Sequence, residues 1–151
     1  MIIAVAEFNK KRNNLHINME LEVAMLHEEI REFWDAKTTA ERLDALVDTK
    51  YVWDGTRIKA SYHGVGIETS MYKWIEDSTS LMYDYLQEEL GDNFHTCYRY
   101  ATKIVCDANA IKGNKLDENG KVLKDDDYNR KIDATAQIAE MLELETKPKG
   151  Y

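Results

Sequence analysis

Residues 26–48, LHEEIREFWDAKTTAERLDALVD, contain two helix-like patterns separated by a short polar break. On both sides of the break, apolar residues recur three or four positions apart, which is the spacing of one face of an α-helix. Thr38 or Thr39, within the break, is a suitable N-cap for the second helix. Because the connection is so short, we expect two antiparallel helices packed against each other.

Helical spacing continues on either side of this stretch. It predicts a first helix over residues 18–36, with Asn18 as N-cap, and a second over about residues 40–53, ending before the triplet DGT. Three more helices are predicted with these bounds: residues 68–90, ended by Gly91; about residues 93–113, begun by Asp92 or Asn93 and ended by Gly113; and residues 132–144. Residues 57–67 are ambiguous, and Asn119-Gly120 centres a polar turn.

The composition agrees with a helical protein. The chain has only seven glycines and one proline among 151 residues, and 44% of the residues are hydrophobic, so long uninterrupted helices around a core are favoured. This length is most simply one domain. The sequence therefore predicts a single all-α domain over residues 1–151, a bundle of four to five helices that includes an antiparallel pair bearing carboxylates.

The net charge of −8 narrows the range of partners. So acidic a surface argues against a nonspecific nucleic-acid binder and against binding to an anionic membrane, but a metal ion could still recruit a nucleotide. The two cysteines, Cys97 and Cys106, form no zinc pattern and suggest a reducing compartment. With neither a signal peptide nor a membrane-spanning segment in view, we expect a soluble cytoplasmic protein.

The acidic residues of the opening stretch lie beside its apolar faces. On a helical wheel, Glu29 and Glu32 share one flank of the first helix, with Glu22 at an earlier turn, while Glu28 faces away from the core. The second helix carries a comparable acidic stripe, made of Glu41, Asp44 and Asp48. Packing the two helices by their apolar faces would bring these flanks together around a small volume.

Crowded carboxylates repel one another, so such a cluster would not be kept for stability alone. A hard divalent cation removes the conflict, because Mg²⁺ takes oxygen ligands and typically combines a few carboxylates with substrate phosphates. The pattern thus predicts a site for one or more Mg²⁺ ions and a phosphate-bearing substrate. The alternative is a non-catalytic helical interaction or regulatory protein with solvated acidic faces, since 28 of the 151 residues are Asp or Glu.

Four segments, in order, resemble one protein family. They are AEFNKKRNNL (6–15), LHEEIREFWDA (26–36), RLDALVDTKYVWDGT (42–56) and CDANAIKGNKLDENGKVLK (106–124). The chain resembles the all-α nucleoside triphosphate pyrophosphohydrolases, the MazG-like and phosphoribosyl-ATP-pyrophosphohydrolase-like superfamily, in the short stand-alone form common in bacteriophages. That family has EExxE on one helix, ExxD or DxxxD on the next, and a closing Asn- and Lys-containing segment with a D-x-x-G-K-V turn.

The resemblance implies an activity and a set of site residues. The reaction would be Mg²⁺-dependent hydrolysis of a (deoxy)nucleoside triphosphate to monophosphate and pyrophosphate, with Mn²⁺ as a substitute cation and Glu29 or Glu32 as the proton acceptor. The implied metal ligands are Glu28, Glu29, Glu32, Asp44 and Asp48; the implied substrate contacts are Asn109, Lys112 and Lys115.

The chain departs from the family pattern at two points. Ala45 stands where the ExxD form has its glutamate, so Asp44 must substitute from a neighbouring turn. About residues 57–100 form an aromatic-rich insertion before the closing segment, suited to an extra helix over the pocket, a partner surface, or both. The resemblance further implies a homodimer or homotetramer, and the host cytoplasm as location if the chain is encoded by a phage.

Overall fold

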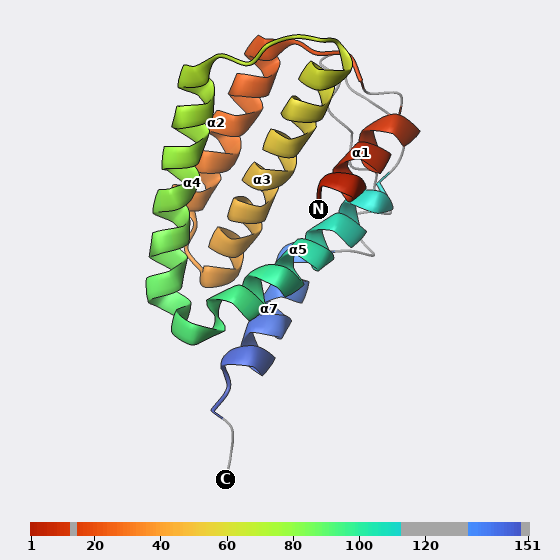
Figure 1. Cartoon of the computed structure of the whole chain (residues 1–151). Coiled ribbons are helices and arrows are strands. Elements are labelled where there is room, and N and C mark those ends of the chain that lie inside the picture. Colours follow the sequence, from red (N-terminus) through yellow and green to blue (C-terminus); the bar gives the residue numbers. More distant parts are fainter. Residues whose placement is uncertain (13–14, 113–132, 149–151) are drawn as a thin grey trace.

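All regular structure in the described residues, 1–12, 15–112 and 133–148, is helical (Figure 1). The computed structural model contains, in chain order, α1 (Ile2–Lys11), α2 (Met19–Asp35), α3 (Thr39–Tyr62), α4 (Thr69–Leu90), the short 3₁₀-helix η1 (Gly91–Asn93), α5 (Phe94–Ala110) and α7 (Ala134–Thr146). The predicted all-α bundle is confirmed, and each of the five predicted helices has its counterpart in α2, α3, α4, α5 or α7. The N-terminal helix α1 was not predicted.

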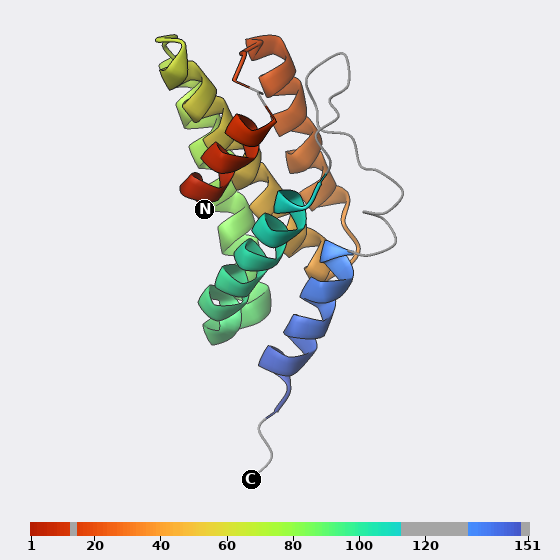
Figure 2. The same ribbon diagram turned by 90° about the vertical axis from the view of Figure 1, so that its right-hand side faces the viewer.

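Helix α3 is the central element, because α1, α2, α4, α5 and α7 all contact it. Figure 1 shows α2, α3 and α4 running alongside one another, with α5 and α7 inclined to them, and Figure 2 shows the same arrangement from the side. The main core joins α3 to α5 and α7 through buried apolar side chains that include Leu43, Leu46, Val105 and Ile138. A second cluster, with Leu26, Trp53, Met71 and Ile75, holds α2 and α4 against α3.

The predicted helix starts have the expected chemistry. The Asn18 side chain accepts a hydrogen bond from the Leu21 amide, and Thr38 Oγ1 accepts one from the Glu41 amide at 3.1 Å, so both residues are N-caps. Gly91 ends α4 with φ of +57°, a left-handed conformation that glycine adopts without steric cost. Asn93 occupies the N-cap position of α5, but its side chain makes no capping hydrogen bond.

The predicted end of the second helix is wrong, because α3 runs through the DGT triplet to Tyr62. Gly55 is buried inside the helix, and a Cβ atom built on it would make ordinary van der Waals contacts with α1, 3.5 Å from Asn9 Nδ2 and 3.6 Å from Val5 Cγ1. The glycine therefore lies where α1 packs on α3 and does not break the helix. Helix α5 ends at Ala110, before the predicted stop; Gly113 and Asn119-Gly120 lie outside the described residues.

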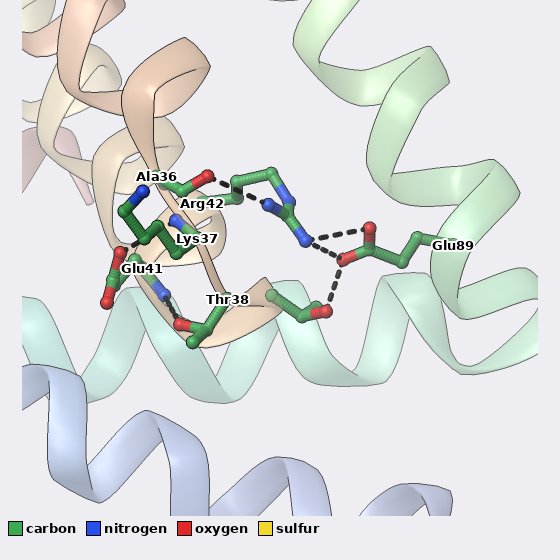
Figure 3. Close-up of polar contacts among 7 residues, drawn as sticks. Ala36, Lys37, Thr38, Glu41, Arg42 and Glu89 are labelled. Carbon is green, nitrogen blue, oxygen red and sulfur yellow. Dashed lines mark hydrogen bonds and ion pairs between the residues drawn. The ribbon is translucent and has the colours of Figure 1, made fainter.

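A polar corner fixes the connection between α2 and α3 (Figure 3). Arg42 donates from Nη2 to both carboxylate oxygens of Glu89 at 3.0 Å, and from Nη1 to the Ala36 carbonyl at 3.2 Å. Thr39 also donates to Glu89. This corner ties the turn between α2 and α3 to the C-terminal end of α4.

The segment expected to be an insertion, about residues 57–100, is part of the bundle. Its main element, α4, buries Met71, Ile75, Met82 and Leu86 against the two clusters of the core. The segment thus contributes to the fold, while its expected role over a pocket or at a partner surface stays a prediction. Among the described residues, no helix combines the length and apolar character needed to cross a membrane.

Candidate metal centre

Three acidic side chains on two helices converge. Glu29 and Glu32 project from α2 and Asp48 from α3, and one oxygen of each lies within 4.8 Å of the others. Glu29 and Asp48 are half-buried and Glu32 is exposed, so the group lies at the edge of the core and is open to solvent on one side. The expected meeting of the two acidic flanks is therefore present for these three residues.

Helix geometry and the core explain why they meet. Residues three apart on a helix are neighbours on its surface, which places Glu29 beside Glu32. Phe33 follows Glu32, Val47 precedes Asp48, and both apolar side chains are fully buried in the main core. Because the two helices are fixed by their apolar faces, the carboxylates cannot separate without disturbing that packing.

The electrostatics of the group centre on Glu29. Burial raises the pKa of its carboxyl group to about 9, and the negative charges of Asp48 and Glu32, a hydrogen bond with Glu32 and the charge of Glu28 act in the same direction. Among the described residues, the Oε2 atom of Glu29 is buried and has no hydrogen-bond partner. In the absence of a cation, these effects all favour the protonated form of Glu29.

The donor set fits a hard divalent cation. Three carboxylates supply the oxygen ligands that Mg²⁺ prefers, and they leave positions of an octahedral shell for water and phosphate oxygens. A cation would also provide the buried Glu29 oxygen with a partner and would remove the repulsion that raises the pKa of this group. Glu29, Glu32 and Asp48 are therefore the described residues that could hold the ion.

Two further predicted ligands, Glu28 and Asp44, lie outside this group of three. Glu28 is exposed, as the helical wheel predicts, and the effect of its charge on the pKa of Glu29 is the smallest of the causes above. Asp44 is half-buried, and its Oδ2 accepts a hydrogen bond from Thr135 Oγ1 at 2.8 Å. Asp44 thereby links α3 to the first turn of α7, a contact that spacing within α3 could not reveal.

The remaining acidic residues of the two flanks have other partners. Glu22 is 3% exposed, pairs with Lys59 and accepts a hydrogen bond from Thr56 Oγ1 at 2.9 Å. Glu41 accepts a hydrogen bond from the Lys37 amide at 2.9 Å, as part of the cap at the start of α3 (Figure 3). Neither carboxylate contributes to the group of three.

The predicted substrate contacts lie at the C-terminal end of α5. Asn109 is buried in the last turn and Lys112 is half-buried just beyond it, while Lys115 lies outside the described residues. The Asn109 and Lys112 carbonyls both accept hydrogen bonds from Arg12. Arg12 lies in the segment AEFNKKRNNL, but the sequence did not indicate a role for it, because α1 was not predicted as a helix.

Tyr51 is a further residue that sequence reasoning did not assign to the site. It is buried on α3, about one turn after Asp48. Burial raises the pKa of its hydroxyl, with smaller effects from Cys106, Arg12 and Asp48. Cys106 is on α5, Arg12 directly follows α1 and Asp48 is on α3, so Tyr51 lies near residues from all three segments.

Comparison with known proteins adds no assignment. No protein-family model, no curated protein and no solved structure matches this chain. The interpretation of the site therefore depends on its own geometry and on the motifs described above.

Proposed function

We propose that this protein hydrolyses a nucleoside or deoxynucleoside triphosphate to the monophosphate and pyrophosphate in a Mg²⁺-dependent reaction. The observation that carries the proposal is the group of Glu29, Glu32 and Asp48, with its mutually close oxygens and its buried Glu29 oxygen. The order of the acidic motifs and the closing Asn/Lys segment supports the same class of reaction. Binding of a cation and a polyphosphate would explain why three carboxylates lie so close together.

In this reaction, water attacks phosphorus and the phosphoanhydride bond between the α- and β-phosphates breaks. Mg²⁺ held by the three carboxylates would polarise phosphate oxygens and lower the pKa of a bound water. Glu29 or Glu32 accepts the proton of the attacking water, and pyrophosphate leaves with the bridging oxygen. The two helices hold these groups in position, which is the main contribution that a protein makes to phosphoryl transfer.

The basic residues after α5 are assigned to the phosphate tail. Lys112 and Lys115 would contact the β- and γ-phosphates as point charges, and Asn109 would be a polar residue of the substrate pocket. Replacing both lysines with alanine should raise KM for the nucleotide more than it changes the affinity for Mg²⁺, because neither lysine is a metal ligand. Unchanged kinetics in the double variant would leave both lysines as solvated surface residues.

We also propose a homodimer or homotetramer that acts in the cytoplasm and binds neither nucleic acid nor membrane. The exposed aromatic residues Trp34, Tyr72 and Tyr85 offer apolar surface for self-association. Light scattering after size-exclusion chromatography tests this part of the proposal, and a monomer at micromolar concentration would contradict it.

A substrate screen tests the proposed function. The protein is incubated with a panel of canonical and modified ribo- and deoxyribonucleoside triphosphates, with Mg²⁺ or Mn²⁺, and pyrophosphate and monophosphate are quantified. At least one substrate should give both products in equal amounts, and Asp48→Asn should abolish their release. Release of orthophosphate alone, or no turnover across the panel, would contradict the proposal.

A metal titration separates the enzyme from the non-catalytic alternative. If the carboxylates form a cation site, Mg²⁺ or Mn²⁺ should raise the melting temperature of the parent protein by mass action, and the Asp48→Asn variant should lose this effect. A melting temperature that divalent cations do not change would favour a helical interaction protein whose acidic flanks are solvated.

A further inference from the structure

Arg12 occupies an unusual position for an arginine. It directly follows α1 and is only 5% exposed. Its Nη1 atom donates to the Phe8 carbonyl at 3.1 Å, and its Nη2 atom donates to the carbonyls of Asn109, at 3.2 Å, and of Lys112. The guanidinium group also lies over the Phe8 ring, with its Cζ atom 3.9 Å from the ring centroid. Arg12 thus joins the ends of two helices that are far apart in the sequence.

The end of α5 needs such a partner. The last carbonyl groups of a helix have no intrahelical donor, and the C-terminal end carries a partial negative charge that favours a nearby cation. The last turn of α5 contains no basic residue of its own. Arg12 supplies both the donors and the positive charge: its Nη2 atom reaches both carbonyls at the end of α5, while its Nη1 atom reaches the Phe8 carbonyl of α1, a span that suits the planar guanidinium fork.

Arg12 is itself held in place from the side of α3. The Phe8 ring beneath it makes an edge-to-face contact with Tyr51, with 5.6 Å between ring centroids. Tyr51 lies about one turn from Asp48, and α1 fits closely over Gly55 on the same helix. A continuous set of contacts therefore leads from the carboxylate-bearing helix, through α1, to the end of α5. Both views of the molecule place α1 beside that end (Figures 1 and 2).

We propose that Arg12 is a positioning residue, which holds the end of α5 so that Asn109 and Lys112 face the triphosphate bound at the carboxylates. This inference depends on the function proposed above, because it assigns Arg12 to the binding of that substrate. Arg12 does not contact the reacting atoms in this scheme. Its substitution should therefore weaken nucleotide binding and leave the chemical step and the metal site intact.

The test compares Arg12→Gln and Arg12→Lys with Arg42→Gln. Arg42 is a matched control, because it is also largely buried and also donates to a backbone carbonyl and fixes a helix junction, but at the corner shown in Figure 3. We expect Arg12→Gln to raise KM about tenfold, the equivalent of one lost charged hydrogen bond, with kcat within about twofold of the parent. Arg12→Lys should recover part of the loss. Arg42→Gln should lower the melting temperature without changing KM.

A second measurement needs no substrate. In hydrogen–deuterium exchange, the amides at the end of α5 should exchange faster in Arg12→Gln than in the parent and in Arg42→Gln, while the effect of Mg²⁺ on the melting temperature should stay the same. Should Arg12→Gln not fold, Arg12→Lys provides the same comparison.

The possible outcomes are distinguishable. Unchanged exchange at the end of α5 would overturn the structural part of the inference. Faster exchange with an unchanged KM, or a fall in kcat at constant KM, would overturn the positioning role. If the parent protein hydrolyses no nucleotide, the proposed function fails and the substrate role of Arg12 fails with it, whereas the exchange result still decides whether Arg12 holds the end of α5.

Discussion

Two glutamates on helix α2 have neighbours of opposite charge. Glu22 and Glu29 are seven residues, about two turns, apart on α2, and both are directed towards α3. Glu22 meets Lys59 and Thr56, so its charge is neutralised within the chain. Glu29 meets Asp48 and Glu32, and among the described residues no lysine or arginine forms an ion pair with it.

The difference shows that the pair of α2 and α3 combines a polar contact whose charges cancel, Glu22 with Lys59, and a group of like charges, the carboxylates around Glu29. A buried acid and base that satisfy each other need nothing from solvent, and they fix the register of the two helices. A group of like charges lowers stability until a proton or a cation neutralises it, so binding of a cation offsets the cost of bringing the carboxylates together. Burial alone therefore does not identify the candidate metal ligand on α2; the charges of the neighbouring side chains distinguish Glu29 from Glu22.

The largest effect on stability is expected at the ion pair of Glu22 and Lys59. Glu22→Gln removes the anion from a nearly buried ion pair and leaves the Lys59 ammonium without compensation, which should cost about 3–5 kcal/mol of unfolding free energy. Urea denaturation measures this value. The double variant Glu22→Met with Lys59→Met should be nearly neutral, because it removes both charges. A loss below about 1 kcal/mol in the single variant would mean that the pair is solvated.

The largest effect on activity is expected in the carboxylate group of Glu29, Glu32 and Asp48. Glu29→Gln and Glu32→Gln should each lower turnover by about 10²-fold or more, the scale of losing a positioned acid–base group or ligand. Glu28→Gln is the matched control, since this neighbour is exposed and lies outside the group of three, and it should lower turnover far less. Equal losses at Glu28 and Glu29 would contradict a site built on a single flank of α2.

A smaller effect is expected in the pH dependence of stability without metal. Burial and the neighbouring carboxylates raise the pKa of Glu29 to about 9 in the folded protein, whereas the ordinary pKa of 4.5 applies when the chain is unfolded. Between these values the folded state binds more protons, so the unfolding free energy should fall as pH rises from 4.5 to 9. Glu29→Gln should remove most of this decline and be no less stable than the parent at pH 8.

Thermal unfolding at several pH values, with a chelator present, checks this prediction. Saturating Mg²⁺ is the control, because it stabilises the ionised carboxylates and should flatten or reverse the decline. Identical pH profiles for the parent and Glu29→Gln would mean that Glu29 is ionised in the folded protein and that the repulsion inferred at the site is absent.

The smallest effect is expected where α3 meets α7. Thr135→Val removes the hydroxyl that donates to Asp44, and it should cost about 1 kcal/mol of unfolding free energy. It should leave the affinity for Mg²⁺ unchanged, because Asp44 lies outside the group of three. Isothermal titration with Mg²⁺ compares Thr135→Val with Asp44→Asn. A large loss of affinity in Asp44→Asn alone would restore Asp44 as a ligand.

The parts of the fold that depend on local chemistry could be predicted from the sequence. The caps at Asn18 and Thr38 and the glycine end of α4 at Gly91 are set by residues within one turn of the helix end, so the sequence contains the whole signal. The convergence of Glu29 with Asp48 also follows from helical spacing and one short connection. These features need no knowledge of distant segments.

The features that the sequence did not reveal all depend on contacts between distant segments. Gly55 was interpreted as a break because α1, which packs over it, was not predicted. Asp44 and Asp48 are both half-buried on α3, but Asp44 accepts a hydrogen bond from Thr135 of α7, a contact that spacing within α3 does not indicate. In the same way, Lys59 decides the role of Glu22 from another helix. Helical spacing in the sequence predicts which face of a helix a side chain occupies, but the residues that contact it there come from distant segments and are not predicted.

The short connection between α2 and α3, residues 36–38, also has a consequence for the order of folding events. Contacts between segments adjacent in the sequence form faster than those that must close long loops, so this hairpin can pair before α5 and α7 dock. Glu29, Glu32 and Asp48 then come together while the rest of the core is still being assembled. Their repulsion opposes an early step, so conditions that neutralise it, acid or a divalent cation, should increase the folding rate constant and leave the unfolding rate constant nearly unchanged.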